Sequence, residues 1–177
     1  MKMQLLGLLV LATVSCDRTE KELAGPVREV KLSGPWDSYP ILGISVPESF
    51  TYKRGDGVDF VEHHITSRSG KCSIYIYTGG NSREFVPAAA HAKKGIIGGR
   101  EVTWDHESSN GDATATTSIN MFLNPKPDYK GVFQLCGHRT AVSLTGRNAK
   151  DLDALKRICE TLRLIRPRLV NDHSQSN

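Results

Sequence analysis

The residues of this sequence that can take part in the most kinds of chemistry are its four cysteines and six histidines. Thiolates and imidazoles act as nucleophiles, general bases and metal ligands. Their spacing does not match a zinc site, because the sequence has no CxxC or HExxH pattern. His63 and His64 are adjacent in an expected strand and so point to opposite faces, and Cys136-Gly137-His138 is the one closely spaced cysteine–histidine pair. We therefore expect neither a metal site nor a cofactor.

Catalysis by these residues would require a nucleophile or base held in place by an orienting group. Cys136 with His138 is one such combination. A second set joins His106 to the nearby carboxylates, which are Asp105, Glu107 and Asp112. Alternation along a strand places Asp105 and Glu107 on the face opposite His106, which weakens the second set. We assign no catalytic residue and expect a protein that is not an enzyme.

Tyr75 and Tyr77 are the candidate binding residues. They lie in an expected strand over residues 72–77, on the face opposite Ile74 and its apolar neighbours. A tyrosine ring can be buried while its hydroxyl stays hydrated, so this pair, with nearby lysine and arginine, suits a glycan, a peptide or an anionic headgroup. The alternative is that both rings pack beneath a helix. An open sheet face would favour binding, and a sheet covered on both sides would favour packing.

Residues 1–15 are typical of a secretory signal peptide, with a positive charge at Lys2 followed by an apolar stretch too short to span a bilayer comfortably. The segment Ala12-Thr13-Val14-Ser15-Cys16 resembles the bacterial lipobox, although Thr13 replaces the usual leucine. This resemblance implies that Cys16 is lipidated and becomes the mature N-terminus. Its acyl chains would then attach the protein to a membrane of the bacterial cell envelope, on the periplasmic face. The choice between inner and outer membrane stays open.

The composition is that of a soluble globular domain, with 38% hydrophobic and 24% charged residues. The net charge is only +4 and no dense block of lysine and arginine occurs, which argues against a nucleic-acid partner. Residues 16–38 mix charges with two Gly-Pro pairs and predict a flexible tether. A single domain is expected over residues 39–167, followed by a flexible tail over residues 168–177.

An exported domain can keep disulfides, and three cysteines follow Cys16. Cys72 and Cys136 both lie in expected strands and are the preferred pair, although the sequence alone does not determine connectivity. Cys159 lies on the apolar stripe of an expected helix, and we interpret it as a small buried hydrophobic residue.

Short β-type runs separated by turn residues predict an antiparallel sheet of about six or seven strands. The clearest signal is Asn110-Gly111, which favours a type I′ hairpin. Pairing about this turn joins positions whose numbers sum to 221, so that Trp104 faces Thr117 and His106 faces Ala115. The other expected strands cover residues 41–46, 58–66, 72–77, 132–136 and 140–144.

Two helices are expected to cover this sheet. An alanine-rich stretch that ends before Gly95 predicts the first helix over residues 82–94. The second is expected over residues 149–164, with Asn148 as its N-cap and apolar residues at helical spacing. The expected fold class is therefore α+β.

The order of these elements resembles that of the PsbP-like superfamily. The resemblance rests on Ile44-Ser45-Val46-Pro47 at the start of the domain, on Gly98-Gly99-Arg100-Glu101-Val102-Thr103-Trp104, and on Val142-Ser143-Leu144-Thr145-Gly146 before the terminal helix. It covers roughly residues 40–165 and implies a sandwich in which an antiparallel sheet lies between helices. It also implies a binding or assembly role without catalysis. The resemblance assigns a function to no residue of this sequence, because no site motif of the family is matched.

These observations predict a lipid-anchored cell-envelope protein that acts as a non-enzymatic binding or accessory module for another envelope component. The expected partners are a membrane, through the N-terminal lipid, and an envelope protein. A periplasmic carrier of a small ligand, with an apolar pocket between helix and sheet, is an alternative. A hydrolase is a weaker alternative, because the sequence offers no convincing set of nucleophile, base and oxyanion-stabilising groups.

Overall fold

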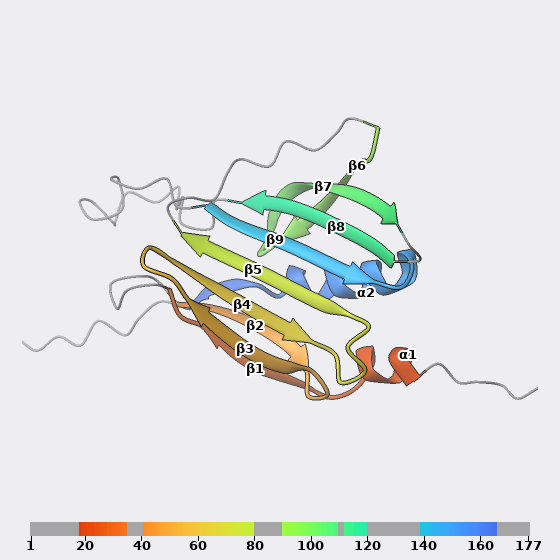
Figure 1. Cartoon of the computed structure of the whole chain (residues 1–177), viewed down its shortest axis with the longest axis horizontal. Helices are drawn as coiled ribbons and strands as arrows, with labels where there is room; N and C mark the ends of the chain where they lie inside the picture. Colours follow the sequence, from red (N-terminus) through yellow and green to blue (C-terminus); the bar gives the residue numbers. More distant parts are fainter. Residues whose placement is uncertain (1–17, 35–40, 80–89, 110–111, 120–138, 166–177) are drawn as a thin grey trace, which may run out of the picture.

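The computed structural model describes residues 18–34, 41–79, 90–109, 112–119 and 139–165. Within these residues the chain forms two helices and ten strands, and the strands build two antiparallel sheets (Figure 1). In chain order the elements are α1 (Arg18–Leu23), β1 (Val27–Leu32), β2 (Ile41–Pro47), β3 (Thr51–Asp56), β4 (Phe60–Thr66), β5 (Ser73–Gly79), β6 (Ala92–Ile97), β7 (Arg100–Ser109), β8 (Asp112–Ile119), β9 (Arg139–Gly146), α2 (Ala149–Glu160) and β10 (Arg163–Ile165).

The described part of the molecule has two layers. The large sheet has seven strands in the order β3-β4-β5-β9-β8-β7-β6, and the small sheet has the order β1-β2-β10. The small sheet and α2 lie together behind the large sheet in Figure 1, and so cover one of its faces. Side chains from both layers meet in a single core, whose fully buried members include Leu42, Ile44, Ile74, Leu144 and Leu155.

Helix α2 begins at the residue that the sequence predicts. The Asn148 side-chain oxygen accepts a hydrogen bond from the Asp151 backbone N–H at 3.0 Å, which satisfies one of the free N–H groups of the first turn. The apolar stripe of the helix faces the core, and its buried residues are Leu152, Leu155, Ile158 and Cys159.

The same helix ends at Glu160, so the prediction that it continues to residue 164 is wrong. The Thr161 hydroxyl donates to the Ile158 carbonyl oxygen at 2.6 Å and accepts from the Ser45 backbone N–H at 2.9 Å. These two hydrogen bonds complete the last turn and link it to β2. The following residues form β10, which pairs with β2 and extends the small sheet.

The prediction of a helix over residues 82–94 is wrong at its C-terminal end, because residues 92–97 form the edge strand β6. Residues 80–89 lie outside the described part of the chain. Gly95 does not end a helix. It lies in β6 against Trp104, where an added Cβ would be only 2.5 Å from the indole nitrogen. The glycine is needed for this close approach of backbone and ring.

The prediction of a flexible tether over residues 16–38 is wrong for the segment that forms α1 and β1. Strand β1 pairs with β2 along its whole length, with Val30 opposite Ile44 and Leu32 opposite Leu42. Val30 and Leu32 are buried, whereas the other residues of β1 are exposed. Burial of these two side chains is enough to order the otherwise polar segment, because the segment can also pair with the edge of β2. The globular part therefore includes residues before 39.

The hairpin predicted from Asn110-Gly111 is confirmed in register, since His106 lies opposite Ala115 in the β7–β8 pair. Strands β2, β4, β5 and β9 confirm the predictions over residues 41–46, 58–66, 72–77 and 140–144. An α+β fold built on an antiparallel sheet with two helices is thus confirmed, although one of the helices is α1 rather than the predicted one. In the described residues helix α2 and the small sheet cover only one face of the large sheet, so the expected sandwich of a sheet between helices is not shown. The strand predicted over residues 132–136 lies outside the described residues.

The signal peptide over residues 1–15, Cys16 and the tail over residues 168–177 also fall outside the described part of the chain. Within that part, neither helix has the length and apolar character needed to cross a bilayer.

Candidate functional site

The two faces of the large sheet have different surroundings. Ile74 and Ile76 of β5 point toward α2 and the small sheet and are fully buried. No described helix or strand lies over the opposite face, onto which Figure 1 looks. Strand pairing places one row of side chains across this open face, formed by Lys53, His64, Tyr75, Ser143 and Thr116, and the row ends at Asp105, which is buried.

Five neighbouring residues of β4 and β5 form what we call the aromatic patch: Phe60, Glu62, His64, Tyr75 and Tyr77. The rings of Phe60 and Tyr77 stack with centroids 5.2 Å apart and an interplanar angle of 20°. The rings of His64 and Tyr75 meet at 5.0 Å and 58°. The Tyr75 hydroxyl donates to Glu62 Oε1 at 2.8 Å, and His64 Nε2 lies 3.4 Å from Glu62 Oε2. Glu62 therefore holds the second ring pair in a defined orientation.

The electrostatic setting keeps both tyrosines neutral. Burial, followed by the hydrogen bond to Glu62, raises the pKa of Tyr75 well above its usual value. Burial and the carboxylates of Asp59 and Glu62 also raise the pKa of Tyr77. The patch can thus offer ring surfaces and neutral hydroxyl groups to a ligand, but not a phenolate nucleophile.

The sequence-predicted residues Tyr75 and Tyr77 lie on the open face, beneath neither of the two helices that the structure describes. Sequence reasoning missed Phe60, Glu62 and His64 as their neighbours. A usable signal was present in the turn between β4 and β5, because pairing about it joins positions that sum to 139 and so places Glu62 beside Tyr77 and His64 beside Tyr75.

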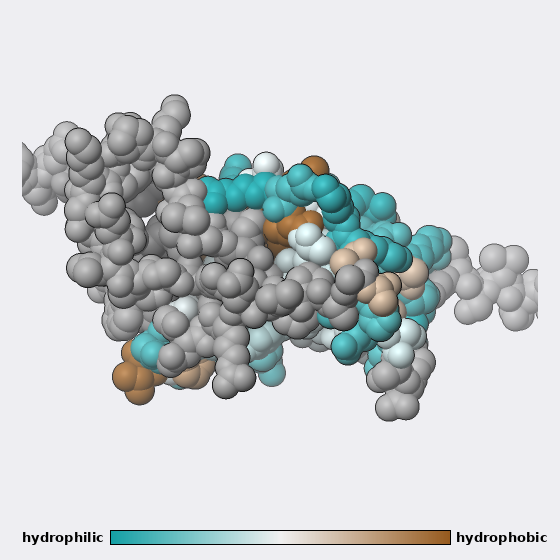
Figure 2. Space-filling model, turned by 90° about the horizontal axis from the view of Figure 1, so that it is seen from above, coloured by the Kyte–Doolittle hydropathy of each residue, from teal (hydrophilic) through white to brown (hydrophobic). Residues whose placement is uncertain are grey.

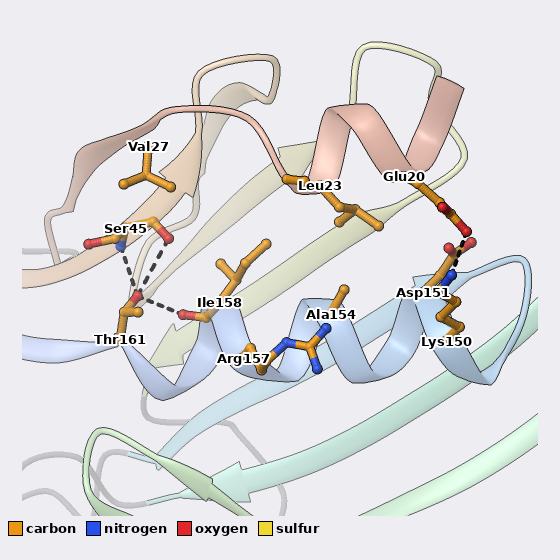
Figure 3. Close-up of a pocket in the computed structure, with 11 residues that line it drawn as sticks. Glu20, Leu23, Val27, Ser45, Lys150, Asp151, Ala154, Arg157, Ile158 and Thr161 are labelled. Carbon is orange, nitrogen blue, oxygen red and sulfur yellow. Dashed lines mark hydrogen bonds and ion pairs between the residues drawn. The ribbon is translucent and has the colours of Figure 1, made fainter. Parts of the chain in front are cut away.

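A second concave region is a groove of about 730 Å³ between α1, the start of β1 and α2 (Figure 3). Its apolar lining comes from Ala24 and from Leu23, Val27, Ala154 and Ile158, and these last four project toward the space between the two helices. The ion pair between Lys150 and Glu20 borders one end, at 2.6 Å, and the Ser45–Thr161 hydrogen bonds border the other. The groove does not lie where the sequence predicts a carrier pocket, which is between helix and sheet. There, Leu152, Leu155 and Trp104 fill the space between α2 and the large sheet.

His106 contacts a lysine and not the carboxylates considered from the sequence. Lys156 Nζ lies 2.8 Å from His106 Nε2 and 5.9 Å from the centre of the Trp104 ring. Burial, together with Lys156 and Lys93, lowers the pKa of His106, and burial likewise lowers the pKa of Lys156. Asp105 lies on the other face of β7, as alternation predicts. The Lys156 contact joins residues 50 positions apart, so no local pattern reveals it.

The described cysteines are buried thiols with raised pKa values. Burial, with a contribution from Asp151, raises the pKa of Cys72 to about 12, and burial also raises the pKa of Cys159. Both thiols are free and buried in the structure. Cys136, the expected disulfide partner of Cys72, and His138 lie outside the described residues, so that pairing stays a prediction. Over the described ranges, no three side chains of histidine, cysteine, aspartate or glutamate gather as metal ligands.

Other exposed hydrophobic residues do not form a competing surface. In the described ranges the large ones are Val27, Val58 and Ile96, which lie in β1, in the β3–β4 turn and in β6. Figure 2 looks down on the molecule from the side of β6 and β7, where the described residues are mainly hydrophilic and hydrophobic side chains occur in small groups. Among the described surfaces, the aromatic patch and the α1–α2 groove are thus the two regions suited to a ligand.

Comparison with known proteins yields no match: no family model, no curated protein and no solved structure is similar to this chain.

Proposed function

We propose that this protein is a lipid-anchored component of the bacterial cell envelope that acts as a non-enzymatic binding module with a PsbP-like fold. In this proposal Cys16 carries the lipid, and the aromatic patch binds another envelope protein. The observation that carries the proposal is the open face of the large sheet, where four aromatic rings, counting the imidazole of His64, lie side by side.

The physical properties of the patch support binding. Tyrosine and phenylalanine bury a large area with few rotatable bonds, and aromatic residues are enriched at the centres of protein interfaces. The Phe60–Tyr77 stack and the Tyr75–Glu62 hydrogen bond restrain these rings before any partner arrives. Pre-organisation of this kind reduces the entropy lost on association. Around the patch, Ser143 and Thr116 supply hydroxyl groups for a polar rim.

Two experiments test the two parts of the proposal. Mass spectrometry of the mature protein from its native host, with palmitate labelling, should find acyl chains on residue 16 and none in the Cys16→Ser variant. Affinity capture then uses the Cys16→Ser protein as bait in envelope extract, with mass spectrometry of the retained proteins. The expected result is one stoichiometric protein partner.

Matched variants connect that partner to the patch. Truncating two central aromatic residues of an interface typically costs several kcal/mol, so Tyr75→Ala with Tyr77→Ala should weaken capture roughly 30-fold or more. Val58→Ala with Ile96→Ala removes exposed hydrophobic side chains elsewhere and should leave capture unchanged. The proposal fails if the folded wild-type protein captures nothing, or if both double variants lose the partner equally.

The α1–α2 groove favours a second candidate function, the carriage of a small amphipathic ligand. A volume of about 730 Å³ with five apolar lining residues falls in the range of ligand sites. Native mass spectrometry of the purified protein should then show an added mass that Ala154→Trp, which fills the groove, removes. An unliganded mass for the wild-type protein would exclude this function.

A further inference from the structure

The domain begins almost directly after the proposed anchor. Cys16 precedes Arg18, the first residue of α1, by two positions. A fully extended chain spans at most about 3.6 Å per residue, so the start of α1 lies within about 7 Å of the Cα atom of Cys16. If Cys16 carries the lipid, α1 must therefore lie next to the membrane surface. This step depends on the proposed lipidation.

Helix α1 is firmly attached to the rest of the fold, so its position determines which end of the domain meets the membrane. Glu22 Oε2 accepts hydrogen bonds from the hydroxyl of Ser69 at 2.9 Å and from its backbone N–H at 3.3 Å. Its carbonyl oxygen accepts from the Ser49 hydroxyl at 3.0 Å. These bonds join α1 to the β4–β5 and β2–β3 turns, and Figure 1 shows α1 at one end of the long axis.

The exposed side chains of this end carry an excess of positive charge. We call Lys21, Arg68 and Lys71 the basic end; all three are exposed, and none forms an ion pair within the described part of the chain. Lys21 and Arg68 line the same small cleft, of about 310 Å³, with Glu48 as its exposed carboxylate. Glu20 is already paired with Lys150, and Glu22 is buried. Among the described residues of this end, three unpaired basic groups thus outnumber the one exposed acid that has no basic partner, Glu48.

We propose that the basic end docks on anionic phospholipid headgroups of the membrane that carries the anchor. A lysine or arginine close to an anionic bilayer contributes about 1 kcal/mol, and this attraction decays within a Debye length. The short link to Cys16 brings the basic end inside that distance. The lipid and the three side chains then act together, as in membrane proteins whose stable attachment needs two signals.

The first test uses the Cys16→Ser protein, which cannot be lipidated, in sedimentation with vesicles. It should bind vesicles of 70% phosphatidylcholine and 30% phosphatidylglycerol more tightly than vesicles of phosphatidylcholine alone, by roughly 10- to 100-fold at low salt. Lys21→Gln, Arg68→Gln and Lys71→Gln together should abolish the difference. The matched control removes three lysines elsewhere, with Lys31→Gln, Lys53→Gln and Lys93→Gln, and should retain it. Equal binding to both vesicles, or equal loss in both triple variants, would overturn the proposal.

A second test distinguishes docking on the headgroups from the closeness to the membrane that the lipid anchor alone imposes on α1. In the lipidated protein in anionic vesicles, amide exchange should be slowed over residues 18–25 and 67–72 relative to the protein in neutral vesicles. A flexible insert of 12 glycine and serine residues between Asp17 and Arg18 should leave this protection in place, because the charges still attract the headgroups. Loss of the protection in the insertion variant would refute docking. Absence of acyl chains on Cys16 would instead refute the anchor, a result that the vesicle test with the Cys16→Ser protein does not depend on.

Discussion

The two faces of the large sheet are built by the same strands and differ in what determines their side chains. On β5, Ile74 and Ile76 are fully buried toward α2, while Tyr75 and Tyr77 alternate with them in sequence and lie on the open face. Packing explains the first pair, because a close-packed interior penalises any change of volume. It does not explain the second pair, since serine or threonine, as at Ser143 of β9, would suit the same open face. The aromatic patch therefore points to a role outside stability.

The inner face should be the more sensitive of the two. Ile76→Ala would leave a cavity beneath α2 and should lower the free energy of unfolding by about 2–5 kcal/mol. Urea denaturation followed by circular dichroism measures this loss. Ile96→Ala, at a hydrophobic residue of β6 that is 50% exposed, is the matched control and should change stability by less than about 0.5 kcal/mol. Equal losses at the two positions would remove the distinction between the faces.

His63 is the one polar exception on the inner face of β4, and it should make stability depend on pH. It is buried against Tyr52, whose hydroxyl lies 3.0 Å from Nδ1, and burial together with Arg54 lowers its pKa to about 4. The unfolded chain binds the proton near pH 6.5. Stability is therefore full above pH 6.5 and falls as the pH decreases toward 4, by about 3 kcal/mol in total.

Unfolding by urea at pH 7 and at pH 4 measures this loss, and His63→Gln should remove most of it. His64→Gln changes the neighbouring residue on the open face and should leave the pH dependence in place. A wild-type pH dependence that persists in His63→Gln would show that other groups cause it.

Gly95→Ala tests how tightly β6 approaches the inner side of β7. The added methyl group would lie 2.5 Å from the Trp104 indole nitrogen, and the ring is fully buried, so it must move. The expected loss is about 1–3 kcal/mol, with a change in the fluorescence of Trp104. Gly55→Ala in β3 meets its nearest atom at 3.5 Å and should be tolerated. A stable Gly95→Ala variant with unchanged fluorescence would contradict this packing.

The open face should give the smallest change in stability. Tyr77→Ala and Tyr75→Phe should each alter the free energy of unfolding by less than about 1 kcal/mol, because both side chains are partly exposed. Tyr75→Phe removes only the hydroxyl that donates to Glu62, so it should keep most of the binding that Tyr77→Ala loses. A large loss of stability in either variant would mean that the patch serves the fold and not a partner.

The parts of the fold that follow from local signals could be predicted. Asn110-Gly111 determines the register of β7 and β8, and Asn148 with Asp151 determines where α2 starts. The same local reasoning was wrong around Gly95, because its helix propensity and stop signal are outweighed by the contact with Trp104. It was also wrong for β1, whose two buried residues form too short a pattern to distinguish a strand from a linker.

The candidate site was predictable only in part for a related reason. Alternation within β5 places Tyr75 and Tyr77 on one face, and this needs no tertiary information. The neighbours Phe60 and Glu62 require the register of β4, which the turn between β4 and β5 indicates. The contact between Lys156 and His106 instead requires the packing of α2 on the large sheet. Interactions between distant segments depend on how elements pack, which residue spacing does not encode.

Because only one residue separates Cys16 from α1, a lipid on Cys16 would limit how far the domain can move from the membrane. A flexible tether of 22 residues would let the domain explore roughly 26 Å around its anchor. Two residues allow only about 7 Å. Tyr77 follows Lys71 by six residues, so the Tyr77 end of the aromatic patch lies no more than about 20 Å from the basic end. A lipidated chain would therefore search for partners by lateral diffusion within a thin layer over its own membrane, and it could not extend to a binding site on the opposite one.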